Sequence, residues 1–169
     1  MTDDVILGEL DAAGRPIHDG PGRHLMLLCD WSPAAQRAIR ETVTKHGRPD
    51  EITPSRLIWT TPKAPWTEIL IHRDAVTIDD VRFPYTCAAH LEGVVKAEIK
   101  GKVLLNVYDL GWGVVVDRFR GRISVFSDRE GVNLLIVDIV GKVAREGLTV
   151  ADAQLMFKKG VLQVLEGSV

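Results

Sequence analysis

The chain has 169 residues, which suits a single domain with its own hydrophobic core, because folding at this size buries about 70 % of the surface that the unfolded chain exposes. Its 21 basic and 23 acidic residues give a formal charge of -2, so a broad electrostatic contact with nucleic acid or acidic lipid is not expected. The chain has no apolar run near the roughly 18 residues of a membrane span, and its start lacks the pattern of a signal peptide, so we expect a cytoplasmic protein with no membrane contact.

The first part of the chain differs in composition from the rest. Residues 1–23 are rich in Asp, Gly and Pro, and we expect an N-terminal arm or a small hairpin there, ahead of a single α+β domain over residues 24–169. The apolar run at residues 24–29 is short enough to be a strand buried on both faces.

A surface helix is predicted next. Ser32 is a suitable N-cap, Pro33 takes the first helical position, where its missing N–H costs nothing, and Gly47 can end the helix in a left-handed conformation. The core-facing side of this helix is expected to carry Ala35, Ala38, Ile39 and Val43.

Two strand-like runs follow the helix. They cover residues 56–61 and 66–72, and the Pro-containing segment between them favours a hairpin. Residues 74–84 are then expected to form a charged connection between elements.

Residues 86–110 admit two interpretations. One is a strand at residues 91–99 followed by a short helix at residues 102–109, and the other is one continuous helix from Ala88.

The segment from Gly113 to Gly160 has the clearest pattern. Two runs rich in β-branched residues flank a turn at Gly121, which predicts a hairpin. Ser127 or Asp128 can cap a first helix that runs to about Glu146.

Thr149 can cap a second helix, with Asp152 three residues on as an aspartate version of the capping box. The whole pattern predicts an α+β fold, in which a mainly antiparallel sheet of about five strands packs against helices and a C-terminal hairpin precedes two helices.

The first of these C-terminal helices is too apolar for an ordinary surface helix, because its aliphatic residues cover an arc of about 200°. We expect it to lie between the sheet and the terminal helix, or to form part of a subunit interface with Met156, Leu162 and Val164. Asn133 falls inside the arc, and a buried amide must find a partner, either a backbone group in the first helical turn or a ligand.

Four residues are candidates for a catalytic role. Cys87, His90 and Glu92 place a thiol, an imidazole and a carboxylate close together, and in a helix Cys87 and His90 would share a face, as nucleophile and base or as two metal ligands. Asp30 follows the apolar run directly, where it could contact a substrate hydroxyl or a cation, or cooperate with Ser32 in capping.

Four further residues are candidates for ligand binding. His72 ends a predicted strand, a setting for a pH-sensitive group or a phosphate contact. Arg118, Arg120 and Arg122 alternate around the glycine turn, and an extended segment would place all three on one side, as phosphate binding needs. The segment lacks the aromatic residue that follows the glycine in RNP1-like motifs, so a solvated hairpin is the expected structure.

The sequence contains no nucleotide-binding, serine-hydrolase, metalloprotease or EF-hand motif, and Cys29 and Cys87 have no CxxC partner. We therefore predict no cofactor, no metal and reduced thiols, with a single disulfide as the alternative.

Abundant apolar helix surface and sparse catalytic chemistry favour an oligomeric binding protein. Its partner would be a second copy, another protein, or a small molecule in a pocket between sheet and helices. One alternative is a small cofactor-independent enzyme that uses Asp30 or the group of Cys87, His90 and Glu92. A third hypothesis is RNA binding through the arginine hairpin, although the charge balance makes nucleic acid an unexpected partner.

Overall fold

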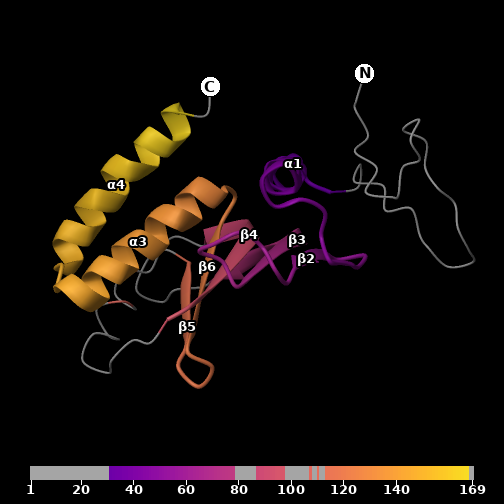
Figure 1. The fold of residues 1–169 in the computed structure, drawn as a ribbon. Coiled ribbons are helices and arrows are strands. Elements are labelled where there is room, and N and C mark those ends of the chain that lie inside the picture. Colours follow the sequence, from indigo (N-terminus) through magenta and orange to yellow (C-terminus); the bar gives the residue numbers. More distant parts are fainter. Residues whose placement is uncertain (1–30, 79–86, 98–106, 108–109, 111–112, 168–169) are drawn as a thin grey trace, which may run out of the picture.

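The computed structural model describes residues 31–78, 87–97, 107, 110 and 113–167 (Figure 1). Six strands form one antiparallel sheet in the order β1-β2-β3-β4-β6-β5. The strands are β1 (Glu51–Ile52), β2 (Arg56–Trp59), β3 (Glu68–Ile78), β4 (Cys87–Lys96), β5 (Val114–Asp117) and β6 (Arg122–Ser127). The helices are α1 (Pro33–His46), α3 (Glu130–Glu146) and α4 (Val150–Glu166).

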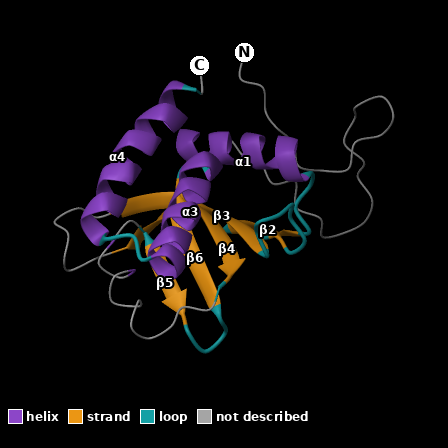
Figure 2. Ribbon diagram, turned by 60° about the vertical axis from the view of Figure 1, so that its left-hand side comes forward, coloured by secondary structure: helices purple, strands orange, loops and turns teal. Residues whose placement is uncertain are grey.

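The α+β class is confirmed, and over the described residues the sheet has six strands rather than the expected five or so. Helices α1 and α3 lie on one face of the sheet, and α4 lies outside α3 (Figure 2). Because α3 contacts both the sheet and α4, its wide apolar arc is covered on two sides, which is the first of the two placements expected from the sequence. None of the described helices reaches the length and apolarity of a membrane-spanning helix.

Alternation along the strands divides the apolar residues between the two faces of the sheet. On the helix-covered face, buried strand residues such as Leu57, Ile71 and Leu91 pack with Ile39 and other helix residues in the main core. A smaller cluster comes from the alternate strand positions Ile58, Leu70 and Val94. Val107 and Leu110, which are helical in conformation, are also fully buried.

The N-caps of α1 and α4 confirm the sequence prediction. Ser32 Oγ accepts a hydrogen bond from the Ala35 N–H at 3.1 Å, and Thr149 Oγ1 accepts one from the Asp152 N–H at 3.2 Å. Gly47 ends α1 with a φ of 84°, which favours glycine, but its ψ of -161° lies outside the left-handed helical region that was expected.

The predicted cap of α3 is wrong. Its N-cap is Arg129, which makes no capping hydrogen bond with its side chain. Strand β6 continues to Ser127 opposite Leu91, so Asp128 lies beside β4 and its Oδ1 accepts the His90 N–H at 3.1 Å. The Ser127 hydroxyl bonds to the Arg129 backbone instead.

Three further sequence predictions change. Because β4 runs over Cys87–Lys96, the continuous helix from Ala88 is wrong; the strand interpretation is confirmed, but the strand begins and ends earlier than the predicted residues 91–99. Because β3 runs to Ile78, the start of the predicted connection at residues 74–84 belongs to a strand. The predicted arm at residues 1–23, the strand at residues 24–29 and most of the helix at residues 102–109 lie outside the described residues.

Strand β3 contains an irregularity that matters for the site. Ile71 pairs with Leu91 and Val76 pairs with Ala89, so residues 72–75 of β3 lie opposite the single residue His90 of β4. We call residues 72–75 the β3 bulge. At this point the regular ladder is interrupted, and backbone groups become available to side chains.

We predict opposite effects from alanine at two glycines. A Cβ at Gly93 would lie 2.8 Å from Trp66 Cε3, in the buried core, whereas a Cβ at Gly141 in α3 would meet only the flexible end of Arg145. Gly93→Ala should lower the free energy of unfolding by about 1–3 kcal/mol through overpacking.

The matched variant Gly141→Ala should raise the free energy of unfolding by about 0.5–1 kcal/mol, because alanine is the better helix former. Urea unfolding at neutral pH measures both values. Equal effects of the two substitutions would contradict this account of the Gly93 contact.

Candidate functional site

A buried carboxylate joins three parts of the fold. Glu130, the first residue of α3, is only 7 % exposed. Its Oε1 accepts hydrogen bonds from Lys45 Nζ at 2.8 Å, from His46 Nε2 at 3.0 Å and from Trp66 Nε1 at 2.7 Å. We call Lys45, His46, Trp66 and Glu130 the Glu130 cluster. It connects the end of α1, the loop before β3 and the start of α3.

The protonation of His46 follows from its two contacts. His46 Nδ1 accepts the backbone N–H of Lys63 at 3.1 Å, so this nitrogen carries no proton. His46 Nε2 must therefore carry the hydrogen, and it donates a hydrogen bond to Glu130 Oε1. The His46 side chain is fully buried, which makes the pair an interior contact rather than a surface one.

Burial raises the pKa of the Glu130 carboxyl, but the hydrogen bonds that it accepts from Lys45, Trp66 and His46 lower it by more, with help from the charge of Lys45. The pKa therefore lies below its usual range. The cluster holds an ionised carboxylate at the start of α3, where the helix dipole also favours negative charge.

A second polar cluster lies at the other end of α1. His90 is 9 % exposed, and its Nδ1 lies 3.0 Å from the His72 carbonyl oxygen in the β3 bulge. A carbonyl only accepts, so Nδ1 carries the proton and Nε2 has the free lone pair. Ser32 Oγ lies 3.0 Å from Nε2 and donates a hydrogen bond to it. The structure thus brings together a hydroxyl and an imidazole in a defined tautomer.

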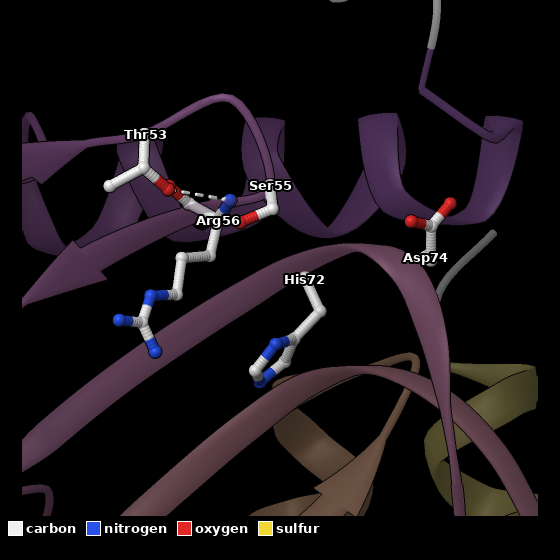
Figure 3. Close-up of a pocket in the computed structure, with 5 residues that line it drawn as sticks. All are labelled: Thr53, Ser55, Arg56, His72 and Asp74. Atoms are coloured by element: carbon white, nitrogen blue, oxygen red, sulfur yellow. Dashed lines mark hydrogen bonds between the residues drawn. The ribbon is translucent and has the colours of Figure 1, made fainter.

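A groove of about 450 Å³ opens beside the β3 bulge (Figure 3). Polar residues line it: Thr53, Ser55, Arg56, His72 and Asp74. Arg56 lies opposite His72 in the register of β2 and β3, and His72 Nε2 bonds Glu92 Oε2 at 3.1 Å. Within the described residues the Arg56 guanidinium has no ion pair. The prediction that His72 ends a strand is wrong. Strand β3 continues past it to Ile78, and His72 is the first residue of the β3 bulge.

The predicted catalytic group does not assemble as expected. Cys87 and His90 would share a face only in a helix, and both lie in strand β4. Glu92 bonds to His72, and His90 bonds to Ser32. The side chain of Cys87 and the whole of Asp30 lie outside the described residues.

Asn133 is fully buried, but its partner differs from the prediction. Its Nδ2 donates to the Leu91 carbonyl of β4 at 3.3 Å, not to a backbone group in the first turn of α3. Its Oδ1 has no hydrogen-bond partner among the described residues. The amide thus fixes the start of α3 to the middle of the sheet.

The arginine hairpin does not present three aligned cations. Arg118 and Arg120 belong to the turn, so the strand alternation that would align them with Arg122 is absent. Arg120 lies 3.8 Å from Asp117, and Arg122 lies 3.7 Å from Glu68. Two of the three charges are therefore offset by neighbouring carboxylates, which leaves little support for phosphate binding.

Sequence reasoning missed Ser32, His46, Trp66 and Glu130 as parts of polar clusters. Ser32 was recognised only as a helix cap, and no local signal links it to His90, 58 residues away.

No family model, no curated protein and no solved structure matches this chain. Over the described residues, no three His, Cys, Asp or Glu side chains gather in a group that could hold a metal ion.

The Glu130 cluster predicts a specific pH dependence of stability. The pKa of Glu130 is lowered in the folded state from an ordinary value of 4.5, so ionisation stabilises the fold above that pH. This stabilisation is lost as the pH falls through the lower pKa of the folded state. At pH 7, Glu130→Gln should lower the free energy of unfolding by about 2 kcal/mol, the scale of hydrogen bonds to a charged group.

Urea unfolding of the wild type and of Glu130→Gln between pH 7 and pH 3 tests this prediction. The difference between their free energies of unfolding should shrink below pH 4.5. Asp138→Asn is the control, because Asp138 forms only an exposed pair with Lys142 and should have a much smaller effect. A difference that stays constant over the whole pH range would show that the Glu130 charge has no such role.

Proposed function

We propose that the protein is a cytoplasmic binding protein that associates with a second copy of itself through the outer face of α4. The observation that carries this proposal is the burial pattern of α4, in which Ala153 is the one buried residue while three leucines are exposed. A helix with a single partner normally places polar residues on its outer face.

The inner face of α4 already has its partner. A Cβ at Gly160 would lie 2.6 Å from Leu135 Cδ2 of α3, and a Cβ at Gly131 of α3 would lie 2.9 Å from Val164 of α4. The absence of side chains at these two glycines brings the helices close together. The contact with α3 therefore uses one side of α4 and leaves the other side open.

The outer face carries Leu155, Leu162 and Leu165, which are 52 %, 60 % and 46 % exposed. Leu155 and Leu162 are seven residues apart, or about two helical turns, and Leu165 follows one turn later, so the three form one stripe. Figure 1 shows α4 as the outermost helix, with the sheet on the far side of α3. An apolar stripe of this kind is typical of an interaction surface.

Charge complementarity favours a second copy as the occupant. Lys158 and Lys159 lie at the middle of α4, whereas Asp152 and Glu166 lie near its ends. In a two-fold pair with antiparallel α4 helices centred at Leu162, Lys158 of each copy faces Glu166 of the other and the two Leu162 side chains meet on the axis, whereas Leu155 lies beyond the end of the partner's α4. The outer face of α4 can therefore pair with a second copy through the apolar contact at Leu162 and through opposite charges.

This proposal predicts a dimer in solution. Size-exclusion chromatography with light scattering at tens of micromolar protein should give twice the mass of the chain. The variant Leu162→Glu should be monomeric, because two carboxylates would meet on the axis, and its fold by circular dichroism should be unchanged, because Leu162 is already exposed in the single chain.

Val115→Glu is the matched control, since Val115 is 45 % exposed on β5, away from α4, and this variant should remain a dimer. A wild-type protein that stays monomeric at this concentration would refute the proposal. An equal loss of dimer in the control would place the interface elsewhere.

A further inference from the structure

We propose that Ser32 is a nucleophile activated by His90 as a general base, and that the protein transfers acyl groups from small polar esters to water through Ser32. This activity is independent of self-association through α4. Of the catalytic residues predicted from the sequence, His90 remains in this proposal, and its partner is Ser32 rather than Cys87.

The hydrogen bonds around His90 define the direction of proton transfer. The His72 carbonyl holds the proton on Nδ1, and Nε2 therefore presents a lone pair to Ser32 Oγ at 3.0 Å. Serine is a weak nucleophile until an adjacent base removes its proton, and a third group that orients the base completes the arrangement. Here the third group is a backbone carbonyl of the β3 bulge.

The capping role of Ser32 does not by itself explain this contact. Thr149 also caps a helix, and its hydroxyl donates to a carboxylate three residues away, Asp152 Oδ2, at 2.6 Å. The Ser32 hydroxyl instead donates to a histidine from the centre of the sheet. Its oxygen also accepts the Ala35 N–H, so a developing negative charge on Oγ would meet an amide donor and the positive end of the α1 dipole.

The surroundings indicate the class of substrate. Ser32 is half-buried and thus partly open to solvent. His72 is shared with the groove in Figure 3, because its carbonyl accepts from His90 while its side chain lines the groove, although Ser32 and His90 themselves are not among the lining residues. The neighbouring groove is lined by hydroxyl and charged side chains, so a substrate that extends from Ser32 past His72 would meet polar groups, which suits short polar esters rather than long aliphatic chains.

The reaction balances without a cofactor. Ser32 Oγ bonds to the ester carbonyl carbon while its proton passes to His90 Nε2, and the bond from that carbon to the alcohol oxygen breaks as the alcohol takes this proton. Water then attacks the acyl-serine and gives its proton to His90 Nε2. The acyl–Oγ bond breaks, Oγ takes the proton back, and a carboxylic acid leaves.

A fluorophosphonate probe tests the nucleophile directly, because its phosphorus bonds to an activated serine with loss of fluoride. We expect one adduct per chain by intact mass spectrometry, and peptide mapping should place it on Ser32. An unlabelled wild-type protein, under conditions in which a known serine hydrolase reacts fully, would overturn the proposal. An adduct on any other residue would do the same, and neither result depends on a variant.

Three variants separate chemistry from folding. Ser32→Asn keeps a good N-cap but has no hydroxyl, so it should not be labelled. His90→Gln should be labelled at least about 100-fold more slowly, the scale of general-base catalysis. Thr149→Ala, which loses the α4 cap instead, should be labelled at the wild-type rate.

Hydrolysis of p-nitrophenyl acetate by the same four proteins gives the second readout, with an initial burst expected for the wild type and Thr149→Ala only. Wild-type labelling of the His90→Gln variant would show that His90 is not the base and would overturn the proposal. Self-association measured by light scattering should not change in Ser32→Asn, so failure of this activity and failure of the dimer remain distinguishable.

Discussion

The buried charge of Glu130 is the constraint on which the rest of the structure depends. A carboxylate that leaves water needs donors, and each of its three donors comes from a segment distant in the sequence. Lys45 and His46 fix the end of α1, and Trp66 fixes the loop that enters β3. Trp66 in turn lies so close to Gly93 that β4 has no room for a side chain there. One carboxylate therefore sets the relation between two helices and the centre of the sheet.

Helix α1 is held by polar contacts at both ends. His46 and Lys45 attach its C-terminal end to α3, and Ser32 attaches its N-terminal end to His90 on β4. Between them the helix rises about 21 Å as a stiff rod, because each residue adds about 1.5 Å. The distance between Ser32 and His90 is thus controlled partly by contacts at the opposite end of the helix. A site on the N-cap of a doubly anchored helix has the preorganisation that proton transfer needs.

Helix α4 stands in contrast to α1. It has one buried residue, and its attachment to α3 depends on the close approach at Gly131 and Gly160. Its leucine stripe is exposed, and α4 lies on the other side of α3 from strands β2 and β3 (Figure 1), whose residues line the groove. Association through α4 would therefore leave Ser32, His90 and the groove open. The two proposals concern separate surfaces of one small domain.

The sequence by itself determined the elements whose signals are local. The two hairpins, the C-terminal helix pair and the caps at Ser32 and Thr149 follow from residue periodicity, turn glycines and cap chemistry within a few positions. Only the tertiary structure decided the partners of the buried polar groups, such as those of Glu130, which lie 64 to 85 residues away. It also decided that Asp128 bonds to β4 instead of capping α3, and that His90 meets Ser32, 58 residues away. The physical reason is that strand register, the β3 bulge and helix docking select these partners, and no local pattern of residue types encodes such long-range geometry.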